Sequence, residues 1–283
     1  MLQAEAVDAE GLMLLEAIAD PHREAIAASD VAVVVAHPDD ETIGCGAQLA
    51  RLHGRIVVLV TDGAPRNGED ARRSGFATPQ AYAAARRNEL LAALRHAAVP
   101  VDAVRTLNIP DQEAALRLVD VARSLLDCFS RCRIRVVLTH AYEGGHPDHD
   151  ATAFAAHSAA ALSSRAGHGI AIVEMPLYRA GPHGPLMQSF IADPARNEIA
   201  VALDQRSRAL KEKMVAAHET QKNVLQGFSL DSERLRLAPA YDFTALPNDG
   251  RLHYDAMPWG MTGKRWLELT TAALNELGIA TPR

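Results

Sequence analysis

The chain has 283 residues, of which 48% are hydrophobic, and its 29 basic and 35 acidic residues give a formal net charge of −6. This length and hydrophobic content are enough for a sizeable core. The acidic balance is not typical of nucleic-acid-binding proteins, so we expect no nucleic-acid partner. No segment approaches the roughly 20 consecutive apolar residues of a membrane span. Residues 1–30 also lack the basic start of a signal peptide. We therefore expect a cytoplasmic protein that does not bind membranes.

The spacing of apolar residues predicts a leading helix over Leu12–Ala27, followed by alternating strands and helices. Five short runs rich in Val and Ile are typical of strands buried on both faces: Val31–Ala36, Ile56–Val60, Val101–Leu107, Ile134–Thr139 and Ile170–Met175. The helices predicted between them are Thr42–His53, Pro79–Ala97, Gln112–Phe129 and Asp150–Arg165. This order predicts an α/β fold with a Rossmann-like, mostly parallel sheet flanked by helices.

After Met175 the sequence is rich in Pro and Gly, which predicts a loop, and helices are predicted over Gln205–Gln226 and Lys264–Leu277. No shift in composition marks a second domain. We therefore expect a single domain over residues 1–283, with a core over about 30–225 and an elaborated C-terminal part over about 176–283. The sequence leaves open whether the chain forms a homo-oligomer.

The three cysteines, Cys45, Cys128 and Cys132, are an odd number in a long chain, so we expect no disulfide framework. Cys128 and Cys132 lie four residues apart in or near the end of a predicted helix. We interpret them as buried helix residues rather than metal ligands.

Two short runs place imidazole and carboxylate side chains just after predicted strands. His37-Pro38-Asp39-Asp40-Glu41 follows the first strand, and His146-Pro147-Asp148-His149-Asp150 follows the fourth. In open α/β sheets ligands bind at the carboxyl ends of the strands, so we expect the two runs to meet there. Two histidines and one aspartate are the ligand set of a catalytic Zn²⁺ that keeps a position open. The residues alone do not decide which acid and which histidine bind the metal.

These runs resemble the motifs of the PIG-L/LmbE-like family of zinc-dependent N-acetylglucosaminyl deacetylases. The resemblance covers about residues 30–225. Its weaker motifs are Thr61-Asp62-Gly63, Arg86-x-x-Glu89, Pro110-Asp111 and the segment Lys211–Gln221, which contains His218.

The resemblance implies a role for each polar residue of the two runs. The implied ligands of Zn²⁺, or of another divalent metal such as Fe²⁺, are His37, Asp40 and His149. Asp39 would be the general base. His146 would stabilise the oxyanion and protonate the leaving amine, with Asp148 orienting it.

One position departs from the family. Some members carry a tyrosine two residues before the first histidine of the second run, where this chain has Gly144, and Tyr142 lies two residues further upstream. Whether Tyr142 takes over that role is left open. The late aromatics Tyr254, Trp259 and Trp266 would either line a sugar pocket or pack in the core. The histidines interpreted as ordinary surface or core residues are His53, His96, His157 and His253.

We therefore expect a hydrolase that removes an N-acetyl group from an N-acetylglucosamine-type sugar or a soluble sugar conjugate, with a small N-acetylated sugar as its partner. The closest alternative is a metal-dependent amidase for a non-sugar amide. His37 and Asp39 with a distant histidine also fit the facial triad of Fe(II) oxygenases, but those enzymes have all-β folds. A non-catalytic Rossmann nucleotide-binding module is less favoured, because Gly44-x-Gly46 lacks the third glycine and follows acidic residues.

Overall fold

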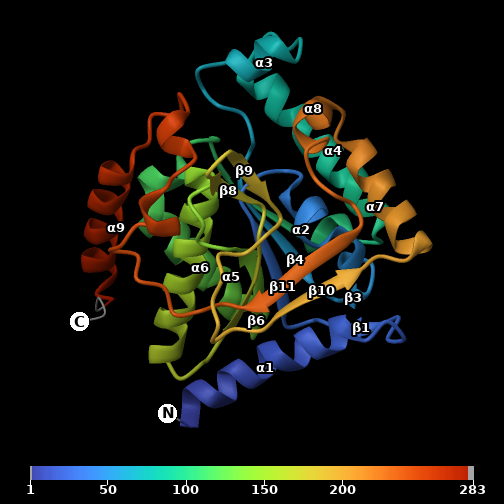
Figure 1. The fold of residues 1–283 in the computed structure, drawn as a ribbon, viewed down its shortest axis with the longest axis vertical. Helices are drawn as coiled ribbons and strands as arrows, with labels where there is room; N and C mark the ends of the chain where they lie inside the picture. The colour runs from blue at the N-terminus through green and yellow to red at the C-terminus, as the bar shows by residue number, and fades with distance from the viewer. Residues whose placement is uncertain (1, 280–283) are drawn as a thin grey trace.

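The central feature of the fold is a seven-stranded sheet between two layers of helices (Figure 1), in a computed structural model that describes residues 2–279. The strand order is β10-β11-β7-β6-β2-β4-β5; the pairs β10–β11 and β11–β7 are antiparallel, and the other neighbouring pairs are parallel. The strands are β2 (Val31–Val35), β4 (Ile56–Thr61), β5 (Val104–Ile109), β6 (Val136–His140), β7 (Ala171–Met175), β10 (Glu198–Ala202) and β11 (Ser232–Leu237). The predicted α/β fold is confirmed, and its mostly parallel sheet differs from the all-β folds of the oxygenase alternative.

The two faces of the sheet are covered by different helices. On one face lie α1 (Leu2–Ala19), α2 (Asp40–Leu49), α4 (Pro79–His96) and α7 (Gln205–Ala217); on the other lie α5 (Leu118–Cys132), α6 (Pro147–Arg165) and α9 (Gly263–Leu277). Strand β2 shows why. Val33 and Val35 pack against the helices of the first face, and Ala32 and Val34 pack against the helices of the second face. Both faces of the strand are buried, which explains its run of apolar residues without alternation.

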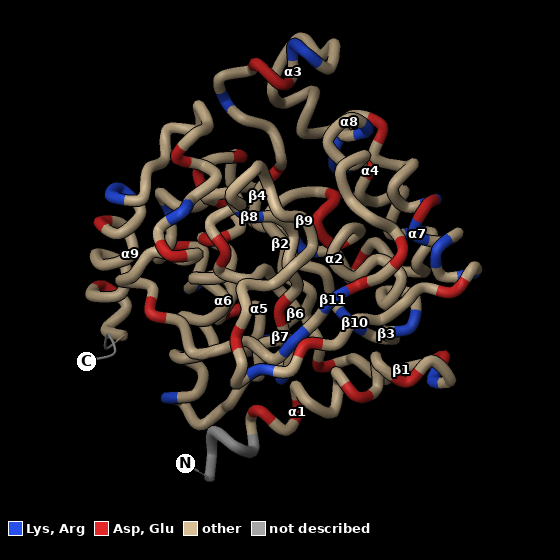
Figure 2. Tube along the Cα trace, viewed as in Figure 1, with Lys and Arg blue, Asp and Glu red and all other residues tan. Residues whose placement is uncertain are grey.

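Short elements decorate this core. They are α3 (Glu69–Arg73), α8 (Lys222–Leu225), the pairs β1 (Ile26–Ala27) with β3 (Leu52–His53) and β8 (Tyr178–Gly181) with β9 (Gly184–Met187), and 3₁₀ turns over Val101–Ala103, Ala114–Arg117, Glu219–Gln221, Asn248–Gly250 and Tyr254–Ala256. Helix α3 lies at the top of the view in Figure 1, near α8. Acidic and basic positions are interspersed along the trace in Figure 2. Within residues 2–279, no helix combines the length and hydrophobicity needed to cross a membrane.

Several predicted elements are wrong in position or kind. The helix predicted over Leu12–Ala27 lies earlier, because α1 begins at Leu2 and ends at Ala19. Other elements have bounds that differ from the predicted ones. Helix α2 ends at Leu49, α5 begins at Leu118 after a 3₁₀ turn, and β5 begins at Val104. The helix predicted over Gln205–Gln226 is broken at His218. The segment after Met175 contains four strands instead of a loop only. Strand β10 at the edge of the sheet alternates between exposed and half-buried residues, so it has no apolar run.

Helix α2 contains a kink at Cys45, whose φ of −148° is not helical. At this point a buried ion pair replaces a backbone hydrogen bond. In a regular helix the Ala47 N–H would donate to the Ile43 carbonyl. Here Ala47 N–H donates to Glu233 at 2.9 Å, and the Ile43 carbonyl accepts from Lys211 Nζ at 2.7 Å. Because Lys211 and Glu233 are themselves 2.7 Å apart, the kink stays fully hydrogen-bonded.

The two histidine-containing runs lie at the point where the strand order reverses. From β2 the chain proceeds through β4 to β5 on one side, and it then crosses to β6 and β7 on the other side. Strands β2 and β6 are directly hydrogen-bonded neighbours. Ligands of doubly wound folds bind at the carboxyl ends of such strands. The sequence therefore placed both runs correctly relative to the sheet.

Candidate metal centre

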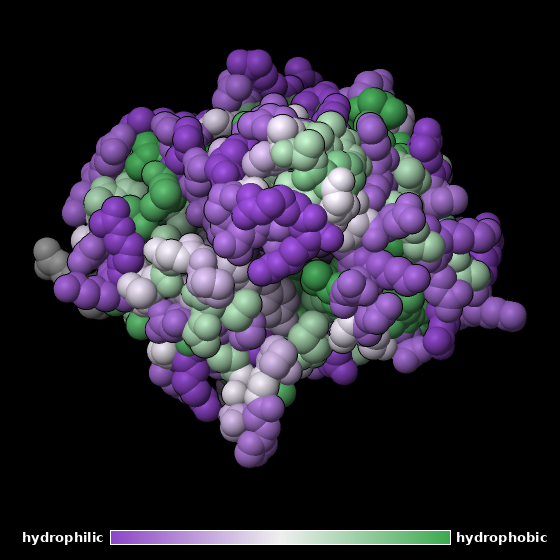
Figure 3. All heavy atoms as spheres, turned by 90° about the horizontal axis from the view of Figure 1, so that it is seen from above, coloured by the Kyte–Doolittle hydropathy of each residue, from purple (hydrophilic) through white to green (hydrophobic). Residues whose placement is uncertain are grey.

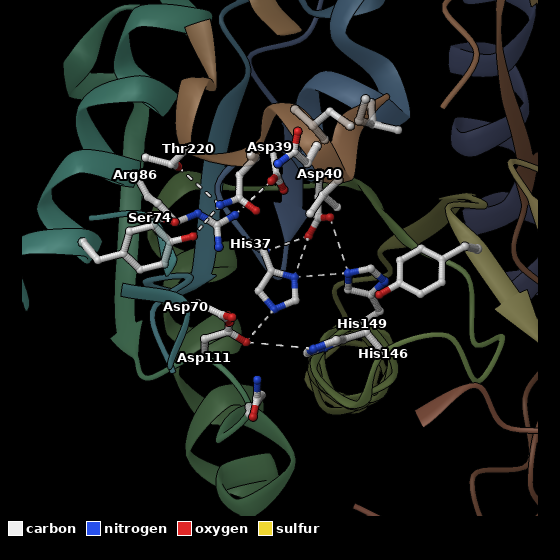
Figure 4. A pocket seen from close by; sticks show the side chains of 18 of the residues that line it. His37, Asp39, Asp40, Asp70, Ser74, Arg86, Asp111, His146, His149 and Thr220 are labelled. Carbon is white, nitrogen blue, oxygen red and sulfur yellow. Dashed lines mark hydrogen bonds and ion pairs between the residues drawn. The ribbon is translucent and has the colours of Figure 1, made fainter. Parts of the chain in front are cut away.

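His37, Asp40 and His149 come together at the carboxyl edge of the sheet (Figure 4). His37 Nδ1 lies 3.2 Å from His149 Nε2, and these two nitrogens lie 3.4 Å from different oxygens of Asp40. All three residues are buried, with at most 7% of their surface exposed. His37 and Asp40 flank the start of α2, and His149 lies in the first turn of α6.

Carboxylates around His37 make this cluster suitable for a cation. His37 Nε2 lies 3.2 Å from Asp111 and 3.3 Å from Asp148, so a proton on Nε2 leaves the Nδ1 lone pair directed at His149 and Asp40. Metal-binding histidines typically donate their other ring N–H to a carboxylate in this way. Burial acts to lower the pKa of His37, but Asp111, Asp148 and Asp40 raise it well above its usual range. The same carboxylates would favour a divalent cation, and the chemistry of the three ligands fits Zn²⁺ or Fe²⁺.

His140 also lies in this cluster, although the sequence analysis did not single it out. Its ring stacks on His149 with centroids 4.3 Å apart, and its Nε2 is 3.4 Å from Asp40. That nitrogen accepts a hydrogen bond from the Ala36 N–H at 2.9 Å. Burial lowers the pKa of His140 to about 4. We therefore interpret His140 as a support for His149 rather than a ligand.

Asp39 is held beside the cluster in an unusual backbone conformation. Its φ is 139°, a value that costs a non-glycine residue of the order of 1–3 kcal/mol. Arg86 compensates, because its guanidinium donates to the Asp39 carboxylate at 2.9 Å, to the Pro38 carbonyl at 3.0 Å and to the Gly63 carbonyl at 2.6 Å. Burial raises the pKa of Asp39 to about 7, although Arg86 acts to lower it. A carboxylate with this pKa suits a general base at neutral pH.

Gly63 explains the Thr61-Asp62-Gly63 motif. Its φ is +67°, and a Cβ at this position would lie 2.4 Å from the Arg86 guanidinium. Only glycine leaves room for the arginine that holds Asp39.

His146 faces the cluster from the start of α6. Its Nδ1 accepts a hydrogen bond from the Asp148 backbone N–H at 3.1 Å, so a proton on Nε2 would point into the site. Asp148 contacts His146 through this backbone N–H and not through its carboxylate. The Asp148 carboxylate instead approaches His37 and accepts from the backbone of Gln112 and Ala114. The carboxylate nearest to His146 Nε2 is that of Asp111, at 4.0 Å.

The cluster lies in a pocket of about 370 Å³ with a mixed polar and apolar lining. The polar residues of the lining beyond the cluster, called the polar wall below, are Asp70, Arg73, Ser74, Arg86, Asp111, Gln112, Thr220, Gln221 and Asn223. The apolar residues of the lining include Ile43, Tyr178, Val224, Leu225 and Phe228. In Figure 4 Thr220, Arg86, Ser74, Asp70 and Asp111 lie to the left of His37, whereas Asp40, His146 and His149 lie to its right. Viewed from above in Figure 3, the surface is largely hydrophilic with separate hydrophobic patches.

Of the aromatic candidates, only Trp259 lines this pocket, where its ring centroid is 4.4 Å from that of His146. Tyr254 and Trp266 are fully buried in the core. Tyr142 does not line the pocket, because its hydroxyl donates to the Ala245 carbonyl and accepts from Trp266. Tyr178 also lines the pocket, although no sequence motif marked it; its ring centroid lies 5.4 Å from that of His149.

Backbone geometry explains why no tyrosine stands at position 144. Gly144 has a φ of +74°, and a Cβ there would lie 2.7 Å from the Leu252 side chain. The N–H of Tyr178 donates to Glu143 at 3.1 Å, which ties Tyr178 to the same loop.

The remaining candidates mostly lie outside the site. His53 and His96 are exposed, and His157 is half-buried beside Phe243. His253 lies at the rim, 6.1 Å from Trp259. The cysteines expected to be buried in a helix, Cys128 and Cys132, are only half-buried in α5.

Residues 32–160 match the family model described as PIG-L, GlcNAc-PI de-N-acetylase. These residues therefore carry a PIG-L family domain. The match contains both histidine runs and the strands that position them, and it supports a deacetylase enzyme. A non-catalytic nucleotide-binding module is thereby set aside.

Solved structures share the fold of this chain. An A40926 pseudoaglycone deacetylase has 20% identity and a TM-score of 0.56 over 75% of this chain and 99% of its own. The N,N′-diacetylchitobiose deacetylase from Pyrococcus horikoshii has 21% identity and a TM-score of 0.55 over 82% of this chain and 92% of its own. A zinc-inhibited form of teicoplanin deacetylase has 17% identity and a TM-score of 0.52 over 73% and 96%. No curated protein matches the sequence.

Proposed function

We propose that this PIG-L enzyme is a metal-dependent hydrolase that removes the N-acetyl group of an N-acetylglucosamine-type sugar or a soluble conjugate of one. The observation that carries the proposal is the convergence of His37 Nδ1, His149 Nε2 and the Asp40 carboxylate within 3.4 Å, next to the base candidate Asp39. Three such ligands on two adjacent turns are typical of a catalytic zinc site that keeps a position open.

The proposed metal ligands are His37, Asp40 and His149, with Zn²⁺ or Fe²⁺ as the ion. When bound, such an ion supplies Lewis acidity, which polarises a carbonyl and makes water more acidic. Buried carboxylates around His37 favour a positive charge at this place. The pKa of Asp40 is held well below its usual range despite its burial, because His149 and His140 lie next to it. Asp40 is therefore ionised and ready to bind a cation.

Asp39 is the proposed general base. One of its oxygens accepts from Arg86, which leaves the other to accept a proton from the attacking water. The water oxygen bonds to the amide carbon while its proton passes to Asp39. The C–N bond then breaks and the proton on Asp39 passes to the nitrogen, which gives acetate and a free amine. We assign this proton to Asp39 and not to His146, as first expected, because the His146 ring that accepts the Asp148 N–H is neutral. His146 is the proposed donor to the oxyanion, because its Nδ1 accepts a backbone N–H and its Nε2 is left to donate.

The polar wall supports a sugar substrate. Arg86, Asp111 and Gln112 offer a mixture of donors and acceptors that suits several hydroxyl groups. Trp259 adds an aromatic ring at the edge of the pocket, and its apolar face would pack against the C–H groups of a pyranose. The alternative substrate, a non-sugar amide, would use the same catalytic groups but would not need this wall.

The test is amine and acetate release from N-acetylglucosamine and its conjugates by protein loaded with Zn²⁺, Fe²⁺ or Co²⁺. The panel includes excess Zn²⁺, because one structural neighbour was solved in a zinc-inhibited form. Asp39→Asn, which keeps the shape of the side chain, should lower kcat by about 10²–10⁴-fold. Turnover of simple N-acetylated amines, but of no N-acetylated sugar, would favour the amidase alternative.

A further inference from the structure

We propose that Glu41 is a positioning residue for the base Asp39, and that His218 holds Glu41 in place. The inference rests on the proposed function and adds two residues to the support of the same site. Arg86 fixes the side chain of Asp39. Glu41 and His218 fix its backbone, which keeps the carboxylate beside the metal cluster.

The backbone of Asp39 needs a partner on its N–H side. With a φ of 139°, Asp39 keeps its conformation only if its surroundings hold it there. The N–H of Asp39 donates to Oε2 of Glu41 at 3.1 Å, and the Pro38 carbonyl accepts from Arg86 at 3.0 Å. This N–H and this carbonyl belong to one planar peptide group. Glu41 and Arg86 therefore hold the peptide group from its two ends, which fixes its orientation.

Glu41 does more than an ordinary acid in the first turn of a helix. Asp39 is the N-cap residue of α2, but its side chain makes no hydrogen bond to the helix. An N-cap aspartate normally accepts from the first free N–H groups of its helix. In a capping box, an acid of the first turn accepts the N-cap N–H in return. Glu41 makes only this second bond, so the Asp39 carboxylate is left for Arg86 and for the proposed proton transfer.

His218 holds the Glu41 carboxylate at its other oxygen. Glu41 is fully buried, and its Oε1 accepts from the Thr42 hydroxyl at 2.6 Å. The Thr42 oxygen lies 3.3 Å from His218 Nε2, so that nitrogen can donate to it. The same nitrogen lies 3.8 Å from Glu41 Oε1. Burial acts to lower the pKa of His218, but Glu41 raises it above its usual range, which favours a positive charge beside the buried carboxylate.

Neither residue is placed to bind the metal or the substrate. Among the described residues, the groups that could hold a metal ion contain neither Glu41 nor His218, and neither residue lines the pocket. His218 reaches Glu41 because α7 ends at Ala217 and the chain turns there. Their hydrogen bonds lead to Asp39, so their effect on the reaction passes through the base.

A double-mutant cycle between Glu41 and Asp39 tests this inference. Glu41→Gln keeps the shape of the side chain, but its single amide oxygen cannot accept both the Asp39 N–H and the Thr42 hydroxyl at the two positions of the carboxylate. We expect kcat to fall about tenfold, KM to stay within about twofold and metal content to stay stoichiometric. In Asp39→Asn protein the same change should lower kcat less than about twofold, because the group that Glu41 positions is already lost.

The outcomes separate this inference from the proposed function. With wild-type turnover intact, an unchanged kcat in Glu41→Gln, an equal loss in both backgrounds or a loss of metal would overturn the role of Glu41 alone. No turnover of any N-acetylated sugar or amine by metal-loaded wild-type protein would overturn the proposed function and, with it, this role.

The hydrogen bond itself can be measured without activity. An amide proton donated to a carboxylate resonates downfield, so the Asp39 signal in a ¹H–¹⁵N spectrum should move upfield in Glu41→Gln. A signal that stays in place would show that Glu41 does not hold this N–H.

Variants of His218 and a control acid complete the test. His218→Ala should lower kcat about threefold and add little to Glu41→Gln, because both act through one chain of hydrogen bonds. His218→Gln, which keeps a donor, should recover most of this loss. Glu174→Gln changes another fully buried acid, whose partners Arg236 and Tyr241 lie outside the pocket, and should leave kcat unchanged. Equal losses of kcat in Glu174→Gln and Glu41→Gln would overturn the positioning role.

Discussion

The ion pair that replaces a hydrogen bond inside α2 predicts a large loss of stability when one partner is removed. Lys211 and Glu233 are at most 1% exposed and 2.7 Å apart. Glu233→Gln leaves the buried Lys211 ammonium without a compensating negative charge. Lys211→Met leaves the Glu233 carboxylate with backbone donors such as Ala47 N–H but no cation. Each single variant should therefore lower the free energy of unfolding by about 3–5 kcal/mol, a large share of the 5–15 kcal/mol typical of a protein domain.

Equilibrium unfolding in urea, followed by circular dichroism, measures these losses. The double variant Lys211→Met/Glu233→Gln should cost at least about 2 kcal/mol less than the sum of the two single variants, because it leaves no unpaired buried charge. The exposed pair Arg265 and Glu268, at 3.4 Å, serves as the control, and Arg265→Met should cost less than about 1 kcal/mol. A loss below about 1 kcal/mol in either buried variant, or strict additivity in the double variant, would refute the reasoning.

Three further predictions concern the site. His149→Ala should abolish stoichiometric metal binding, measured by elemental analysis of purified protein, and full occupancy would contradict its role as a ligand. Gly63→Ala should lower kcat/KM at least tenfold, because the added Cβ would displace the Arg86 guanidinium that holds the base. Gly75→Ala is the control: Gly75 has a φ of +80° but no atoms within 4 Å of an added Cβ, so this variant should lose only about 1 kcal/mol of stability. Trp259→Ala should raise KM for a sugar substrate with little loss of stability, whereas Trp266→Ala should destabilise the core by about 3–5 kcal/mol. An unchanged KM for the sugar in Trp259→Ala would show that Trp259 is not part of the sugar site.

The sequence predicted the sheet and the location of the chemistry because both depend on local patterns. Runs such as Val31–Val35 are buried on both faces, and the polar residues that follow each strand must lie at one edge of the sheet. The same reasoning predicted that His37 and His149 lie close together although they are 112 residues apart in the sequence. In the structure His37 Nδ1 and His149 Nε2 are 3.2 Å apart. Their roles as metal ligands remain a prediction, as does the single domain over residues 1–283.

Features set by long-range contacts were not predictable in the same way. Tyr178 and His140 have no local signal, since each matters only through its contact with His149. The antiparallel strand β11 carries Glu233 on its buried face, and a charged residue there hides the alternation typical of strands. The side chain of Asp148 approaches His37 rather than His146 because the loop at Gln112 supplies backbone donors that fix its direction.

The order of the site residues along the chain has a consequence for how such an enzyme changes its substrate in evolution. The proposed ligands, base and oxyanion donor all lie between His37 and His149, whereas much of the lining, including Tyr178, Val224 and Trp259, comes from later segments. Mutations, insertions or exchanges in those later segments can reshape recognition while the reacting groups keep their support from β2 and β6. New specificities can therefore arise by exchange of the C-terminal half on a constant catalytic half.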